Sequence, residues 1–380
     1  MPKPNELTDQ PSTRTKFGGL AGLRAAGALF FFLAPMLHAE SEFRGLDLPI
    51  TVSGGGFASH RLSGETGSDS NIAGGVRAIA YPTLRINENW YFSGAIQIHS
   101  RPYLFEEFEL QGAGVEVDTL QAYIGYERLW SDKFISVRAG QLASAFGSFS
   151  LRYDDDANPL IDLPIGYGYY YTSPVTTLGL SGVQLEAGAA RVDARVQFTS
   201  SSPTNRRGIR DDGQYGSWTG GAGFTPIQGL RIGASAYRGP YLHDQHPFNL
   251  PGEIHSKLLP ASGLGLDVQF ARGHWYANGE INHFRKAYTV IPTLTQSVGW
   301  GELKYVVHPR WYLAGRLNYS RSNLIPSREQ YEFVVGYRQS RNSLVKVGYQ
   351  VVRGARIRGN LDNVLAVQLV MKITGLSKAF

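Results

Sequence analysis

Apolar and polar residues alternate in about sixteen short segments along the chain. In residues 192–198, for example, apolar side chains occupy every second position and charged or amide side chains stand between them. Successive side chains of a β-strand point to opposite faces, so this period of two predicts amphipathic strands. We expect strands at residues 49–61, 73–86, 90–101, 114–128, 133–142, 176–187, 191–200, 215–225, 230–239, 262–271, 275–285, 294–307, 311–320, 329–338, 343–352 and 364–373.

The links between these segments alternate in length. Tight links fall at residues 87–89, 129–132, 188–190, 227–229, 272–274, 308–310 and 339–342. Longer links fall at residues 62–72, 102–113, 143–175, 201–214, 240–261, 286–293, 321–328 and 353–363. Short turns at one rim and long loops at the other are typical of transmembrane barrels. The pattern therefore predicts an all-β, antiparallel up-and-down barrel of about 16 strands, with 18 as the alternative.

A soluble β-sandwich or propeller also contains many alternating strands, and three observations favour the membrane barrel instead. Strands of about ten residues match a tilted crossing of a bilayer. Polar residues recur on the inner face of nearly every strand, where a sandwich would bury apolar ones. Trp-Tyr pairs at residues 90–91, 275–276 and 311–312 each follow a tight turn, and aromatic side chains collect where a barrel meets the lipid headgroups.

The N-terminal residues predict an export signal. Basic residues precede an apolar stretch from Ala25 to Leu37, and Leu37-His38-Ala39 follows as a cleavage site. The stretch is too short for a membrane-spanning helix, which needs about 20 apolar residues. We therefore expect residues 1–39 to be a cleaved signal peptide and residues 40–380 to form an outer-membrane barrel.

Composition excludes several other classes of protein. The chain has no cysteine, so neither a disulfide framework nor a thiolate metal site is expected. Its formal net charge of +6 is spread along the chain rather than clustered, which argues against nucleic-acid binding. No sequence motif indicates a cofactor, and we expect none.

The strand faces that lie opposite the apolar ones are rich in charge. A charge on the lipid-facing side near the membrane centre costs about 2–4 kcal/mol, so these residues are expected to line the interior. So polar a lining requires water, because a buried charge without a partner is costly. The lining residues expected to act at a constriction are Arg77, Arg138, Arg195, Glu302, Lys304 and Arg316.

The link 143–175 is the longest and the least typical of a solvated loop. It combines aromatic and aliphatic residues with Asp154, Asp155, Asp156 and Asp162. Long irregular loops in compact proteins are often functional. Folded into the barrel, this loop would set its aspartates against the arginines of the wall, and opposed charges across a constriction screen permeants by charge.

This layout resembles bacterial outer-membrane porins, in which the third external loop folds into the channel. Gly140-Gln141 followed by Phe146-Gly147 is similar to a stretch of the phosphate-selective type. The resemblance covers the whole mature chain. It implies a homotrimer, surrounded by outer-membrane lipid and lipopolysaccharide and inserted by the barrel-assembly machinery. One departure is that the strand register stops at Ile373, whereas porins usually end on a phenylalanine that closes the last strand.

Other interpretations of single features remain open. The aspartate triplet lacks the spaced pattern of a calcium loop, and the histidines at positions 243, 246 and 255 match no metal motif, so no metal site is expected. A tyrosine cluster offers possible solute contacts and would make the pore a saccharide channel. Its members are Tyr167, Tyr169, Tyr170 and Tyr171.

An enzyme and a structural or adhesion barrel are the rival functions. The chain has no G-x-S-x-G nucleophile motif, and its scattered histidines form no recognisable constellation, so we expect no catalysis. A structural or adhesion barrel would have a blocked lumen. The sequence therefore favours a porin that passes small hydrophilic solutes or ions passively through a water-filled lumen narrowed by residues 143–175.

Overall fold

The computed structural model describes residues 45–59, 71–101, 114–149, 154–167, 179–200, 216–240, 260–324, 326–354 and 363–374 of the chain. The expected signal peptide, the loop that carries His243, His246 and His255, and the C-terminal tail lie outside the described residues. Tyr169, Tyr170 and Tyr171 lie outside them as well. Among the described residues, no helix is long and apolar enough to cross a membrane.

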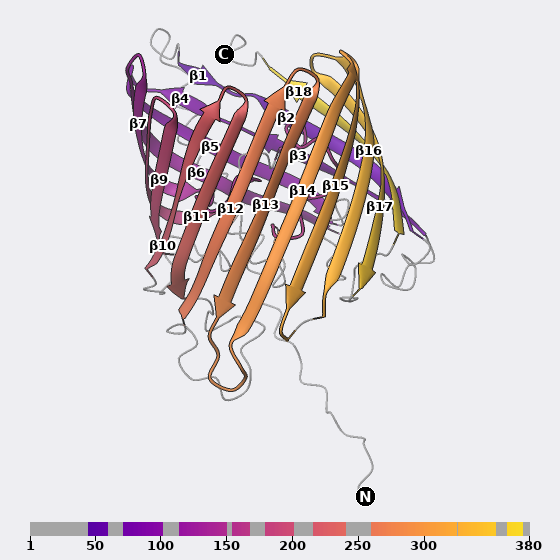
Figure 1. Ribbon diagram of the computed structural model, residues 1–380. Helices are drawn as coiled ribbons and strands as arrows, with labels where there is room; N and C mark the ends of the chain where they lie inside the picture. Colours follow the sequence, from indigo (N-terminus) through magenta and orange to yellow (C-terminus); the bar gives the residue numbers. More distant parts are fainter. Residues whose placement is uncertain are drawn as a thin grey trace, which may run out of the picture.

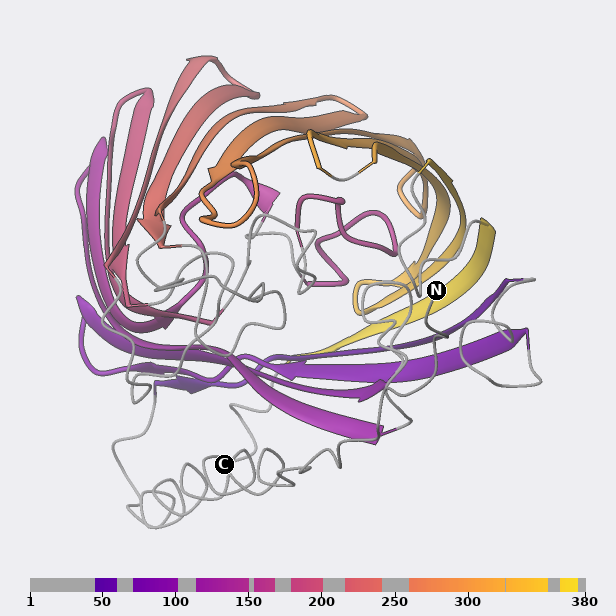
Figure 2. The same cartoon turned by 90° about the horizontal axis from the view of Figure 1, so that it is seen from below.

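The described residues form a single antiparallel sheet of 18 strands (Figure 1). The last strand pairs with the second, where Leu369 lies opposite Gly54, so the sheet closes into a barrel (Figure 2). The strands are β1 (Leu46–Asp47), β2 (Ile50–Ala58), β3 (Ile72–Ala80), β4 (Thr83–Arg85), β5 (Trp90–Arg101), β6 (Gly114–Leu129), β7 (Lys133–Leu142), β8 (Leu180–Ala189), β9 (Val192–Thr199), β10 (Ser217–Ile227), β11 (Leu230–Pro240), β12 (Pro260–Arg272), β13 (Trp275–Lys286), β14 (Leu294–His308), β15 (Trp311–Ser322), β16 (Arg328–Ser340), β17 (Ser343–Gly354) and β18 (Asn363–Ile373).

Two pairs of these strands are single strands interrupted by proline. Pro49 separates β1 from β2, and Pro82 separates β3 from β4. Proline has no backbone N–H to donate to a ladder, so each interruption is expected at that residue. Both β3 and β4 pair with β5, which keeps the wall continuous across the break. The wall thus has sixteen strands, and the predicted antiparallel barrel is confirmed.

The two faces of each strand differ in polarity as the alternation requires. On β15 the outward side chain of Leu317 is 51% exposed, whereas the neighbouring inward side chains of Arg316 and Asn318 are buried. The same alternation on β18 turns leucine, valine and methionine outward and Gln368 inward. The apolar residues therefore cover the outside of the barrel and the polar residues surround its axis.

Short turns and aromatic rings share one rim of the barrel (the upper rim in Figure 1). The ring of Trp275 lies 4.4 Å from that of Tyr305, and the ring of Trp311 lies 4.6 Å from that of Tyr337. Each pair joins neighbouring strands beside a tight turn. Amphipathic rings at this level are suited to a boundary between hydrocarbon and water.

Most expected strand boundaries agree with the structure to within a few residues. The largest difference is at β8, which begins at Leu180 rather than at 176, and residues 168–178 lie outside the described part. The regular alternation is also interrupted by a bulge between β5 and β6. Their pairing passes from Ala95–Gln121 to Ile96–Thr119, which leaves Leu120 as an extra residue in β6.

Candidate functional site

Two described parts of the long link between β7 and β8 lie inside the barrel. Figure 2 shows its described parts, residues 143–149 and 154–167, within the ring of strands. The side chains of Phe146, Phe149 and Leu160 are completely buried. Apolar groups become buried in a polar lumen only where they pack against the wall or one another, so the loop is held against the inner face.

One half of the loop packs on the wall formed by β11–β14. The ring of Phe146 lies 5.3 Å from that of Phe284, and Phe149 meets the edge of Trp300 at 5.9 Å. Phe149 also lies 5.2 Å from Tyr167, which comes from the other described part of the loop. These rings form a continuous apolar cluster inside the barrel.

Glu280 of β13 joins both parts of the loop to this wall. Its carboxylate accepts hydrogen bonds from the hydroxyl of Ser148 at 2.8 Å and from that of Tyr167 at 2.5 Å. It also accepts from the backbone N–H of Ser148. Between these contacts Gly147 has a φ of 69°, and a Cβ added there would meet the Tyr167 hydroxyl. Glycine is therefore required for the loop to approach Glu280 so closely.

The other half of the loop packs on β15–β18. Ile161 joins an apolar cluster with Val334 and Leu344 of the wall. Glu332 of β16 accepts hydrogen bonds from the backbone N–H groups of Ile161 at 2.8 Å and Asp162 at 3.1 Å. At each of the two apolar contacts, a carboxylate of the wall thus accepts hydrogen bonds from backbone N–H groups of the loop.

The buried side chains of Lys346 and Arg316 both donate hydrogen bonds to the loop. The ammonium group of Lys346 donates to the carbonyl oxygens of Asp155, Asn158 and Leu160 at 2.6, 2.8 and 3.0 Å. The guanidinium of Arg316 donates to the carbonyl oxygen of Asp162 at 2.7 Å and to Oδ1 of Asn158 at 2.9 Å. Carbonyls that would otherwise be buried without partners are satisfied by these donors.

Arg316 also pairs with carboxylates of neighbouring strands. It lies 2.9 Å from Glu302 of β14 and 3.6 Å from Glu332. All three side chains are nearly inaccessible to solvent. The charge of Arg316 is therefore balanced within the wall itself, and its remaining donors are directed at the loop.

The aspartate triplet reaches three different places on the wall. Asp155 forms an ion pair with Arg77 at 2.5 Å and accepts a hydrogen bond from Ser53. Asp154 accepts a hydrogen bond from the hydroxyl of Tyr81. The third member, Asp156, lies 3.1 Å from Arg338 and 3.4 Å from Lys372.

Burial opposes the charge of Asp155, yet its pKa is low. Desolvation alone would raise the pKa of this carboxyl, but the positive charges of Arg77 and Lys346 and the hydrogen bonds from Arg77 and Ser53 outweigh it, and the pKa falls to about 2. Asp162 behaves in the opposite way. Burial raises its pKa despite hydrogen bonds from the side chains of Gln330 and Gln350.

Two of the arginines expected to act at the constriction, Arg138 and Arg195, have other partners. Arg138 lies 3.5 Å from Glu186 of the neighbouring strand rather than beside a loop aspartate. Arg195 donates to the backbone carbonyl oxygen of Gly147. The segment that carries Asp154–Asp156 lies against β2, β3 and β16–β18, so its aspartates meet Arg77 and do not meet Arg138 or Arg195.

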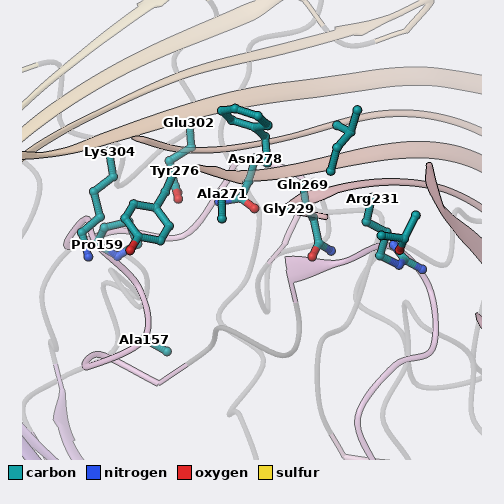
Figure 3. A pocket seen from close by; sticks show the side chains of 13 residues that line it. Ala157, Pro159, Gly229, Arg231, Gln269, Ala271, Tyr276, Asn278, Glu302 and Lys304 are labelled. Carbon is teal, nitrogen blue, oxygen red and sulfur yellow. The ribbon is translucent and has the colours of Figure 1, made fainter. Parts of the chain in front are cut away.

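A cavity of about 420 Å³, lined by both apolar and polar side chains, remains between the loop and β10–β14 (Figure 3). Ala157 and Pro159 of the loop form one side of it. Arg231, Glu302 and Lys304 are among the wall residues that form the other. Arg231 is held between Asp193 at 2.6 Å and Asp267 at 2.8 Å, and the Lys304 ammonium lies 4.5 Å from the centre of the Tyr312 ring.

The main anchors of the loop were absent from the expected site. Glu280, Glu332 and Lys346 lie on the inner face, as the alternation of their strands predicts, but no sequence signal connects them to the loop. Their partners lie between 132 and 191 residues away in the chain. The expected solute contact Tyr167 is 3% exposed and bound to Glu280, which places it among the loop anchors.

Replacing Lys346 with methionine should loosen the loop without opening the barrel. The change removes three hydrogen bonds from a charged donor, and such bonds contribute about 1.5–3 kcal/mol each to stability. We expect faster amide hydrogen exchange at residues 155–162 in the K346M variant. The matched control is K372M, because Lys372 is 42% exposed and makes one long contact with Asp156. Equal exchange in the two variants would contradict the anchoring role of Lys346.

Acid should loosen the same region over a defined range of pH. The pKa of Asp155 in the folded protein is about 2, below its ordinary value of 3.8, so the stabilisation is complete above about pH 4 and is lost as the pH falls toward about 2. This pKa difference corresponds to stabilisation on the order of 2 kcal/mol. Hydrogen exchange of residues 154–160 should accelerate over that range. The D155N variant should lack this acid-dependent step, and an unchanged step would assign it to another group.

No family model and no curated protein matches the sequence. The fold, however, is similar to that of several solved porins. OprB of Pseudomonas putida is 14% identical, with a TM-score of 0.61 over 92% of this chain and 97% of its own. An anion-selective porin of Comamonas acidovorans is 8% identical, with a TM-score of 0.58 over 87% and 99%. OmpT of Vibrio cholerae, an outer membrane protein in a trimer form, is 12% identical, with a TM-score of 0.55 over 86% and 99%. The chain therefore shares the barrel architecture of bacterial porins.

Proposed function

We propose that the protein is an outer-membrane porin, through which small hydrophilic solutes or ions diffuse passively. The observation that carries this proposal is the loop inside the barrel. It is fixed by Glu280, Arg316 and Lys346, and between itself and the wall it leaves a cavity of about 420 Å³ whose lining includes the charged side chains of Arg231, Glu302 and Lys304. A purely structural barrel has no need of a fixed constriction beside hydrated space.

The outer surface supports a membrane location. Leucine, valine and aromatic side chains are exposed on the outside of most strands, and aromatic pairs such as Trp275 and Tyr305 surround one rim. Such a surface is stable in hydrocarbon and unstable in water. Together with the export signal expected in residues 1–39, it places the protein in the outer membrane, with the short turns on the periplasmic side.

No chemical step and no cofactor belong to this proposal. In the described part of the chain, Oγ of Ser297 lies 3.0 Å from Nδ1 of His283. Both residues belong to the outward-facing set of their strands, and His283 is exposed. A nucleophile on the lipid side of the wall has no access to a hydrophilic substrate, so this contact does not favour an enzyme.

A saccharide-selective channel is the alternative closest to this proposal. It would need aromatic faces along the solute path, but Tyr167 is buried by Phe149 and bound to Glu280. A non-conducting structural or adhesion barrel is the other alternative. Conductance measurements distinguish the structural barrel from a general porin, and competition with sugars distinguishes the saccharide channel from it.

Purified protein in planar lipid bilayers should give stepwise increases in conductance, and excess saccharide should leave the current unchanged. A general porin requires both results. Block by a saccharide would support the sugar channel instead. Correctly inserted protein that carries no current would support the structural barrel and overturn the proposal.

The D156N variant should shift the reversal potential in a salt gradient toward anions. Asp156 is the most exposed of the triplet carboxylates that form ion pairs, and its loss leaves Arg338 and Lys372, which are 34% and 42% exposed, without their counter-charge. The matched control is E329Q, which removes one charge from the outer face of β16. If the two variants gave the same reversal potential, residues 154–156 would lie outside the ion path.

We also propose a homotrimer in which the outer face of β2 and β3 meets a second copy. Gly54, Gly56 and Gly74 make this part of the outer surface flat, and small residues allow two walls to approach closely. The trimer form of the similar OmpT structure is in keeping with this arrangement.

Substituting Gly56 with tryptophan should convert the trimer into monomers. The side chain would project from the wall, since a Cβ at Gly56 meets its nearest described neighbour only at 3.5 Å. Gly301 of β14 is the matched control, because a Cβ there meets nothing within 4 Å and lies on the outer face of a different part of the barrel. Chemical cross-linking in mild detergent should give trimers for G301W and monomers for G56W. Monomers for G301W and trimers for G56W would indicate that the interface lies at β14.

A further inference from the structure

Three potential metal ligands meet on the inner face of β5 and β6. His99 of β5 lies directly opposite Glu116 of β6, and Gln97 lies opposite Asp118, so the two carboxylates flank the imidazole. Their outward neighbours Ile98 and Val115 are 49% and 74% exposed on the other side of the wall. The three polar side chains therefore belong to the lumen.

The donor atoms of this group lie close to the separations found between ligands of one ion. Nε2 of His99 lies 3.4 Å from Oδ2 of Asp118 and 3.7 Å from Oε2 of Glu116. The contact with Asp118 is a long hydrogen bond, since bonds between imidazolium and carboxylate usually measure about 2.7–2.9 Å. Bonds of about 2.0–2.2 Å to a tetrahedral Zn²⁺ place neighbouring donor atoms about 3.3–3.6 Å apart. One donor atom from each side chain also lies within 4.8 Å of the other two.

The orientation of the imidazole directs a lone pair at the two carboxylates. Nδ1 of His99 lies 3.1 Å from the carbonyl oxygen of Ser100, which can only accept, so Nδ1 carries the proton. In the neutral ring Nε2 is then an acceptor that faces two further acceptors. Metal-binding histidines are typically held in this way, with one nitrogen donating to a backbone carbonyl and the other bound to the ion.

Exposure differs between the three side chains in a way that would admit an ion from the lumen. The His99 side chain is 1% exposed, while those of Asp118 and Glu116 are 26% and 36% exposed. The buried imidazole is preorganised by the wall, and the carboxylates reach solvent. Three protein ligands leave one tetrahedral position for water.

We propose that His99, Glu116 and Asp118 bind a divalent transition-metal ion on the channel wall, with Zn²⁺ as the best fit. One imidazole nitrogen with two carboxylates suits Zn²⁺ better than Mg²⁺ or Ca²⁺, which prefer oxygen donors alone. His99 is the register partner of Arg77, which holds Asp155 of the loop. The ion would therefore change the charge of the lumen beside the constriction.

Calorimetric titration of the full-length protein with ZnCl₂ tests this site. The protein is freed of metal with a chelator beforehand. His243, His246 and His255 are replaced by glutamine in every sample, so that this loop contributes no imidazole. We expect one Zn²⁺ per chain, with affinity at least about tenfold weaker in H99Q, E116Q and D118N. H283Q is the matched control and should bind as the parent does, because His283 lies on the outer face. Undiminished binding by H99Q would overturn the proposal, as would the absence of binding by the parent.

Conductance provides a second measurement that does not depend on titration. Heat-modifiable migration on gels first shows that each variant forms a folded barrel. Zn²⁺ at a saturating concentration should then shift the reversal potential of the parent toward anions, because it neutralises two lumenal carboxylates. E116Q keeps the imidazole and removes the more exposed carboxylate, so its shift should be smaller. Equal Zn²⁺ responses in the parent, E116Q and H99Q would place the ion elsewhere.

Discussion

The requirement that every buried polar group has a partner organises the inside of this barrel. A loop that enters a lumen brings backbone carbonyls and N–H groups with it, and burying them without hydrogen bonds would cost more than its apolar side chains contribute. Lys346 and Arg316 satisfy the carbonyls, and Glu280 and Glu332 satisfy the N–H groups. The phenyl rings and aliphatic side chains can then pack on the wall, and the constriction has one position.

The same requirement explains why the buried charges of the wall lie on its inner side. A closed ring of strands satisfies its own backbone, so the side chains alone respond to the surroundings. Outward positions such as Leu317 contact an apolar medium, and inward positions such as Arg316 pair with Glu302 or with the loop. Many buried residues are therefore polar or charged, and many exposed ones are hydrophobic.

The barrel was predictable from the sequence because its signals are local. A period of two and short turns with Trp-Tyr pairs behind them both act within a few residues. The position of the loop was partly predictable, since aromatic residues in a long link need something to pack against. Its partners were not, because contacts such as Lys346 with Asp155 join residues 191 positions apart, and alternation says only that Lys346 faces inward. Arg138 and Arg195 satisfied that condition equally well and met Glu186 and Gly147 instead.

The extra residue at Leu120 decides which side chains in the outer half of β6 face the lumen. Along the chain the hydrophobic positions that face outward switch from odd to even between Val117 and Ile124, and a regular ladder could place only one of these sets toward lipid. By absorbing one residue, the bulge reverses the orientation of the outer half, so that Val117 reaches lipid and Asp118 reaches the channel. A single unpaired residue thereby gives the pore two carboxylates that an uninterrupted strand would have left facing the hydrocarbon.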